Sequence, residues 1–166
     1  MRPTTKLSRT LKSTMGLAAA LLIAAPMALG ADISRDEYVA KVEPICKVNT
    51  QANEKILKGV RSRVKNGDFD KAASQFSRAA TALEKTVKQL KATAQPTADE
   101  ATLRRWLGYV DAQVVTLRKV ATALKADNKF KAQSEVLRLT SNANRANSTV
   151  ASFGFTYCRF NPSKFS

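Results

Sequence analysis

The chain has 166 residues, which is enough for one domain and a removable N-terminal leader. Hydrophobic residues make up 44% of the sequence, so a core can form and the composition is not that of a disordered chain. Only 6 glycines and 5 prolines are present, which disfavours a turn-rich β-sandwich or barrel. The formal net charge of +15 favours anionic partners or serves solubility.

Residues 1–31 have the pattern of a secretory signal peptide. Four basic residues and no acidic one precede an apolar run from Gly16 to Leu29, which is shorter than the roughly 20 apolar residues that span a bilayer. The small residues at its end predict cleavage after Gly30 or Ala31. We therefore expect a secreted, periplasmic or cell-envelope protein. Its mature part, residues 32–166, keeps a net charge of +11 once the four basic residues are removed. The alternative is an uncleaved membrane anchor.

The only two cysteines, Cys46 and Cys158, both lie in the mature part. In an oxidising compartment a disulfide between them is the default expectation. It would close a loop of roughly 100 residues, which stabilises a protein by on the order of 4–5 kcal/mol through the entropy of the unfolded chain. Two free buried thiols are the alternative.

The first predicted helix opens at Ser34, where Ser34 and Glu37 can form a capping box. It ends at Asn66-Gly67, because glycine suits a left-handed C-cap. Pro44 lies inside this helix and should kink it about one turn before the first cysteine. The apolar residues recur at helical spacing: Tyr38, Val42, Ile45, Ala52, Ile56, Val60 and Val64.

The second predicted helix begins at Asp68 or Asp70 and ends at Gln95-Pro96. Its apolar positions alternate in steps of three and four, which is typical of a helix that buries one face. They are Phe69, Ala73, Phe76, Ala80, Leu83, Val87 and Leu90.

The third predicted helix opens with a second capping box, Thr97 with Glu100, and is broken at Asp127-Asn128. The same break can cap the fourth helix, which runs from about Lys129 to the glycine at position 154. The two apolar stripes are Leu103, Trp106, Val110, Val114, Leu117, Ala121 and Leu124, followed by Ala132, Val136, Leu139, Ala143, Ala146, Val150 and Phe153.

Four helices of comparable length with short links predict an all-α fold, an up-down-up-down four-helix bundle with one disulfide. The first and fourth helices should be neighbours in such a bundle. The C-terminal tail can then fold back so that Cys158 reaches Cys46. The same tail should dock Phe155, Tyr157 or Phe160 over the open end of the bundle.

A resemblance supports this arrangement. The pair Ile45-Cys46 in the first helix and the segment 154–158, Gly-Phe-Thr-Tyr-Cys, resemble a group of small exported bacterial helical-bundle proteins. That group has Ile-Cys in its first helix and Gly-x-x-x-Cys near the C-terminus. Pro44 departs from the small residue that is commoner at its position. The resemblance implies the fold and the disulfide and implies nothing about activity.

The residue types needed for most catalytic sites are missing. The chain contains no His, which excludes di-iron carboxylate bundles, c-type haem attachment and Ser-His or Cys-His nucleophile pairs. No Gly-rich phosphate loop is present either. We therefore expect no catalytic residue, no metal and no cofactor, and a non-enzymatic module that binds or scaffolds. A hydrolase or lyase that uses carboxylates alone is the remaining enzymatic alternative.

The acidic residues have structural interpretations. Asp36 with Glu37, and Asp99 with Glu100, fall in the first turn of a predicted helix, where acids satisfy caps and the helix dipole. Asp111 adjoins the apolar stripe of the third helix, and we expect an ion pair there rather than general acid–base chemistry.

Polar residues near the stripes have two interpretations. Asn49 and Asn53 on the first helix, with Asn144 and Asn147 on the fourth, can form interhelical amide hydrogen bonds that fix the register. The alternative is a small polar ligand pocket. Three aromatic residues are candidates to line it: Tyr38, Trp106 and Tyr109.

Basic residues gather near the first and third links, which share one end of an up-down bundle. Eleven of them lie there against three aspartates, a local net charge of +8. We name as the basic pole the eight that are candidates for binding anions: Lys55, Lys58, Arg61, Arg63, Lys65, Lys125, Lys129 and Lys131. Its candidate partners are an anionic envelope polymer or lipid head groups. The lack of a known motif and of interleaved aromatics argues against sequence-specific nucleic-acid binding. A solvated surface that offsets helix dipoles is the structural alternative.

Overall fold

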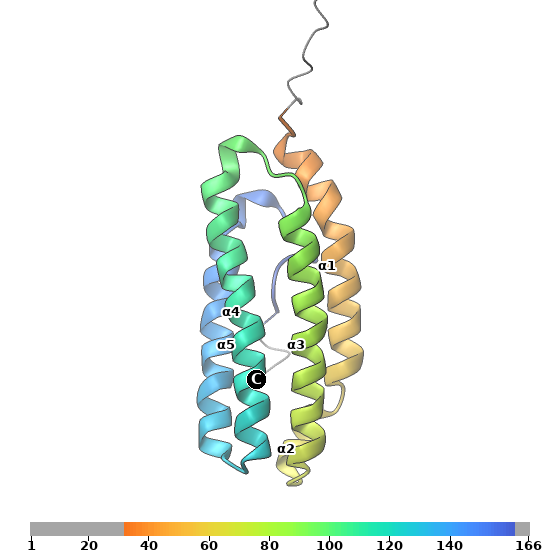
Figure 1. Ribbon diagram of the computed structural model, residues 1–166, viewed down its shortest axis with the longest axis vertical. Coiled ribbons are helices and arrows are strands. Elements are labelled where there is room, and N and C mark those ends of the chain that lie inside the picture. Colours follow the sequence, from red (N-terminus) through yellow and green to blue (C-terminus); the bar gives the residue numbers. More distant parts are fainter. Residues whose placement is uncertain (1–31, 162–166) are drawn as a thin grey trace, which may run out of the picture. The chain divides into compact units, whose positions relative to one another are not determined.

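Four long helices run antiparallel to their neighbours in the computed structural model, which describes residues 32–161 (Figure 1). The predicted all-α, up-down-up-down bundle with one disulfide is therefore confirmed. The predicted leader, residues 1–31, and its cleavage site lie outside the described residues. The helical segments are α1 (Arg35–Leu57), α2 (Val60–Lys65), α3 (Phe69–Ala92), η1 (Thr97–Asp99), α4 (Glu100–Lys125), α5 (Lys129–Thr149) and η2 (Ala151–Phe153).

Two of the predicted helix starts are capped as expected. At α1, the Glu37 N–H donates to the Ser34 hydroxyl at 3.2 Å, and the Ser34 N–H donates to the Glu37 carboxylate at 2.7 Å. At α5, the Asn128 side-chain oxygen accepts from the Lys131 N–H at 2.9 Å. These bonds satisfy N–H groups that have no partner inside the helix.

The second predicted capping box, at Thr97 and Glu100, is wrong. Residues 97–99 form a 3₁₀ turn, and no side-chain cap is made at its start or at the start of α4. The Thr97 N–H donates instead to the carboxylate of Asp32, at 3.0 Å. A residue distant in the sequence therefore satisfies the N–H that Glu100 would accept from in a local capping box. The Asp99 carboxylate pairs with Arg35 of α1.

The first predicted helix is interrupted where the sequence pattern is continuous. Helix α1 continues past Pro44 and ends at Leu57, and Gly59 adopts a left-handed φ of 75° before α2 begins. The Gln75 side-chain amide donates to the backbone carbonyls of residues 56 and 58, at 2.7 and 3.0 Å. These carbonyls lose their helical partners at the break, so Gln75 from α3 satisfies them. Gly67, with φ 82°, ends α2 as predicted.

The predicted apolar stripes form one core. The stripe of α4 is buried throughout, with Trp106 only 1% exposed, whereas α1 buries only Tyr38, Val42 and Cys46. Helix α1 packs on α3, α3 on α4, and α4 on α5. Each helix of residues 32–161 is too short or too polar to cross a lipid bilayer.

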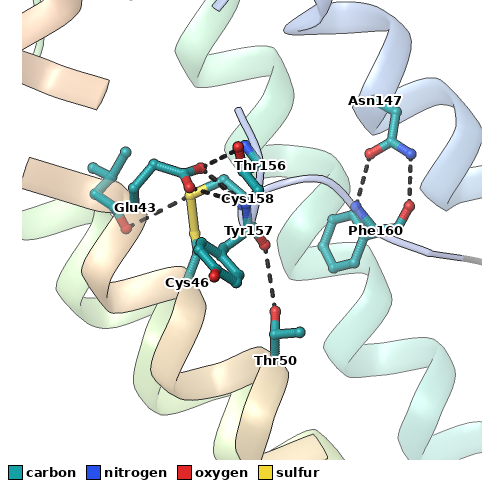
Figure 2. The surroundings of a disulfide bond; sticks show 9 residues. Glu43, Cys46, Thr50, Asn147, Thr156, Tyr157, Cys158 and Phe160 are labelled. Carbon is teal, nitrogen blue, oxygen red and sulfur yellow. Dashed lines mark hydrogen bonds between the residues drawn. A yellow bond between two sulfur atoms is a disulfide. The ribbon is translucent and has the colours of Figure 1, made fainter. Parts of the chain in front are cut away.

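The predicted contact between the first and fourth helices is wrong. No extended packing exists between α1 and α5. The C-terminal tail, which we define as residues 154–161, runs between the two helices instead (Figure 2). The four long helices therefore pack in the order α1, α3, α4, α5 around the core, and the tail fills the gap between α1 and α5.

Candidate ligand cavity beneath the C-terminal tail

The tail is covalently attached to the middle of α1. The sulfur atoms of Cys46 and Cys158 are 2.02 Å apart, and the two Cα atoms are separated by 5.0 Å. Both residues are buried. The disulfide predicted from the sequence is therefore confirmed, and it fixes the tail against the side of the bundle rather than at its end.

Glu43 binds the backbone of the tail beside the disulfide (Figure 2). Its carboxylate accepts hydrogen bonds from the N–H groups of Thr156 at 3.0 Å, Tyr157 at 3.0 Å and Cys158 at 3.1 Å. The Thr50 hydroxyl donates to the Tyr157 carbonyl at 3.4 Å. Two turns of α1 thus satisfy successive polar groups of an irregular segment, which otherwise would need water.

Asn147 of α5 binds the other side of the tail. Its side-chain amide donates to the Phe160 carbonyl and its side-chain oxygen accepts from the Phe160 N–H, both at 2.8 Å (Figure 2). The predicted interhelical amide bonds are therefore wrong, because Asn147 pairs with the tail. Asn53 donates to Asn49 within α1 at 3.1 Å, and Asn144 is exposed.

The tail also contributes an aromatic side chain to the core. Phe155 is 3% exposed, and its ring lies 5.4 Å from Trp106 and 5.3 Å from Phe153, centre to centre. Tyr38 meets Phe153 edge-on at 6.5 Å. Of the three tail aromatics predicted to dock over the open end of the bundle, Phe155 is the one that is buried, and it packs inside the core. Burial raises the pKa of the Tyr38 hydroxyl to about 12.

A half-open cavity of about 630 Å³ lies beneath the tail, lined by α1, α2, α3, α4, one residue of α5 and residues 157–161. This volume is within the range of pockets that bury a drug-sized ligand. The floor consists mainly of apolar side chains that are themselves buried from bulk solvent: Ala79, Leu83, Leu90, Val110, Leu117 and Leu139. All of these residues except Ala79 lie on apolar stripes that the sequence predicted to form the core. Spacing alone cannot tell a side chain that faces another side chain from one that faces a cavity.

Buried polar side chains also line the cavity. The Trp106 indole N–H and the Gln113 side-chain oxygen have no hydrogen-bond partner in the described part of the chain, although these residues are only 1% and 2% exposed. The Gln113 amide nitrogen donates to the Leu139 carbonyl at 3.2 Å, which fixes the position of the side chain. The Asn53 side-chain oxygen on α1 is also buried without a partner among the described residues, so the lining offers one donor and two acceptors in a mainly apolar surface. Of the aromatic residues predicted for a pocket, Trp106 lines the cavity, whereas Tyr38 and Tyr109 do not.

Charged residues lie on the exposed side of the cavity. The lining includes Glu54, Lys58, Arg61 and Arg159, all of them exposed. Three are basic and one is acidic, so this rim carries a net positive charge. Lys58 and Arg61 belong to the basic pole, which thus reaches the mouth of the cavity. The tail residue Arg159 was not among the residues predicted from the sequence to bind anions.

The rest of the basic pole surrounds the α2–α3 and α4–α5 links, which meet at one end of the bundle (Figure 1). The Lys129 ammonium lies 4.9 Å from the centre of the Phe69 ring, which joins the start of α5 to the start of α3. Seven of the eight side chains are exposed, and Arg63 is half-buried. That these residues bind anions stays a prediction.

Of the five acidic residues that we interpreted as structural, four have partners among the described residues: Glu37, Asp99, Glu100 and Asp111. Hydrogen bonds from the Ser34 backbone and hydroxyl hold the pKa of Glu37 below its ordinary value. The Arg35 guanidinium donates twice to Asp99, at 2.6 and 2.8 Å, and lowers the pKa of that carboxyl. Asp111 forms the predicted kind of ion pair, with Lys91 of α3.

Comparison of this chain with models of known protein families, with curated proteins and with solved structures finds no match. The fold and the cavity geometry are therefore the basis for assigning a function.

Proposed function

We propose that this protein is a non-enzymatic binding module that holds a small apolar molecule in the cavity beneath its C-terminal tail. The observation that carries the proposal is the cavity itself, about 630 Å³ with a mainly apolar floor and three buried polar atoms that have no partner among the described residues. An apolar ligand would remove this floor from water at a gain of about 25 cal/mol for each Å² covered. A few polar groups in such a floor orient a ligand.

Binding is favoured over catalysis by the positions of the carboxylates. Glu54 is the only acidic residue in the cavity lining. Glu37 is part of a helix cap and Asp99 is paired with Arg35. Hydrolysis of the glycosidase kind uses two carboxylates that flank one substrate, and the described lining supplies one.

We further propose that the protein acts outside the cytoplasm, in the cell envelope or as a secreted protein. The support is the leader pattern of residues 1–31 and the disulfide between the only two cysteines. Intact mass of the protein recovered from the medium and the envelope tests this, with and without reductant. Full-length mass in the cytosol with free thiols would contradict it.

The single tryptophan of the chain gives a direct assay for the cavity, because Trp106 lines it. We expect the neutral probe N-phenyl-1-naphthylamine to bind in a saturable way, to become fluorescent and to quench Trp106 by energy transfer. Leu83→Phe fills part of the cavity and should weaken binding. The matched control is Leu137→Phe, the same change at a side chain of α5 that is 65% exposed. Equal binding by both variants and the wild type would contradict the proposal.

A second candidate function is electrostatic binding of anionic polymers or lipid head groups by the basic pole. It is favoured by the exposure of seven of these eight side chains at one end of the bundle. Retention on heparin and on anionic vesicles should fall as the salt concentration rises. It should fall further in the triple variant Arg63→Glu, Lys65→Glu, Lys129→Glu. The control is Lys85→Glu with Lys88→Glu, exposed residues in the middle of α3. Unchanged retention in the first variant would reject this function.

A further inference from the structure

We infer that the ligand is an anionic amphiphile: an extended alkyl chain of about ten to twelve carbons with a carboxylate head group. This inference rests on the proposed function and adds the chemical class of the ligand. It is carried by three observations: the length of the cavity, its polarity and the charge of its rim.

The cavity is elongated along the bundle. Its floor extends on α3 from Ala79 to Leu90 and on α4 from Trp106 to Leu117. Eleven residues of α-helix at about 1.5 Å each give a floor roughly 16 Å long. A C–C bond is about 1.5 Å, so an extended chain of about ten to twelve carbons covers most of that length.

The two ends of the cavity differ in polarity. Helices α1 and α3 are antiparallel, so the break between α1 and α2 at Gly59 lies at the level of the Ala79 end of the floor. The hydrogen bonds from the Gln75 amide to the carbonyls of residues 56 and 58 fix this register. Lys58 and Arg61 flank this break and are exposed. The opposite end reaches Leu90 and Trp106, which are both buried. A ligand with one polar head and one apolar tail matches this gradient.

The rim selects the sign of the head group. Lys58, Arg61 and Arg159 outnumber the single acid, Glu54, among the exposed lining residues. A carboxylate near Lys58 and Arg61 gains charge-assisted hydrogen bonds while its chain covers the floor. Arg159 follows the cysteine that is bonded to Cys46, twelve residues before Lys58, and adds to the positive charge along the rim. A quaternary ammonium group of the same chain length would meet the same positive rim and be repelled.

The test compares three ligands that share a ten-carbon chain: decanoate, decan-1-ol and decyltrimethylammonium. Each one displaces N-phenyl-1-naphthylamine from the purified, oxidised full chain, below the concentration at which the ligand forms micelles. We expect decanoate to bind about fivefold to tenfold more tightly than decan-1-ol, because two partly exposed ion pairs supply that much. Decyltrimethylammonium should bind most weakly, and raised salt should bring the three affinities together.

A double variant separates the rim from the overall charge of the protein. Lys58→Gln with Arg159→Gln should weaken decanoate about fivefold and leave decan-1-ol unchanged. Lys85→Gln with Lys88→Gln removes the same charge from exposed positions of α3 that do not line the cavity, and should change neither ligand.

The outcomes distinguish this inference from the function on which it rests. Equal affinity for the three ligands, with the probe still bound and displaced, would overturn the anionic head group and keep the binding function. Equal weakening of decanoate by both double variants would also overturn it, since overall charge would then be the cause. Absence of probe binding to the wild type would overturn the proposed function itself.

Discussion

Removal of the disulfide by the double substitution Cys46→Ser, Cys158→Ser should destabilise the protein mainly by freeing its unfolded chain. The two residues are 112 positions apart in the sequence. The loop-entropy relation then gives about 16 cal/mol/K, or about 5 kcal/mol at 25 °C. In the folded state Glu43 and Asn147 still bind the tail, so little helical structure should be lost.

Urea unfolding followed by circular dichroism measures this loss. Small proteins lose about 1–3 kcal/mol of stability per molar urea, so the midpoint should fall by about 2–4 M. The slope should rise, because the unlinked chain exposes more surface when it unfolds. Wild-type protein treated with a reducing phosphine should reproduce the behaviour of the double variant.

A control variant acts on the folded state alone. Glu43→Gln weakens the bonds to three N–H groups of the tail and keeps the disulfide, so it should cost about 1–2 kcal/mol with an unchanged slope. A loss below about 1 kcal/mol in the double serine variant, or a folded form with clearly less helix, would refute the reasoning.

Three further predictions concern positions away from the tail. Gly59→Ala should destabilise the protein by about 1–2 kcal/mol, because φ is 75° and the only cost is backbone strain, since no atom lies within 4 Å of the new Cβ. Gly108→Ala inside α4 has equal space and should stabilise the protein by about 0.5–1 kcal/mol. Changes of the same sign in urea unfolding would contradict this prediction. Because the pKa of Asp99 is lowered in the folded state, its carboxylate contributes fully to folding stability above the ordinary pKa of about 4, and this contribution is lost as the pH falls through the folded-state pKa. The stability difference between wild type and Asp99→Asn should therefore shrink below about pH 4 in acid titrations. Tyr38→Phe removes a fully buried hydroxyl that has no partner among the described residues, so thermal unfolding should show stability unchanged or raised by up to about 1 kcal/mol, and a loss above about 2 kcal/mol would indicate a hydrogen bond in the folded protein.

The helices could be predicted from the sequence because their signals are local. Apolar spacing located the buried faces of α3 and α4, and the capping residues Ser34 and Asn128 located two starts. The break at Gly59 was missed because an isolated glycine in a helical pattern costs only about 1 kcal/mol. What favours the break is Gln75, which satisfies the freed carbonyls from a different helix.

The site was harder to predict because its parts come from distant segments. The sequence identified the disulfide, Trp106 and two basic residues of the rim, Lys58 and Arg61. It gave no sign that the tail would replace the contact between α1 and α5. The bonds from Glu43 and Asn147 that hold the tail there join residues 13 to 115 positions apart, and no local pattern encodes them.

The position of the tail also sets the order in which the protein matures. Cys46 leaves the ribosome 112 residues before Cys158, which at about 5–20 residues per second is a delay of roughly 5–20 s. During that interval the helices can assemble, but the outer wall of the cavity has not yet been synthesised. A nascent or truncated chain therefore lacks a complete cavity, whose wall is finished only when residues 157–161 have been added and Cys158 has been oxidised.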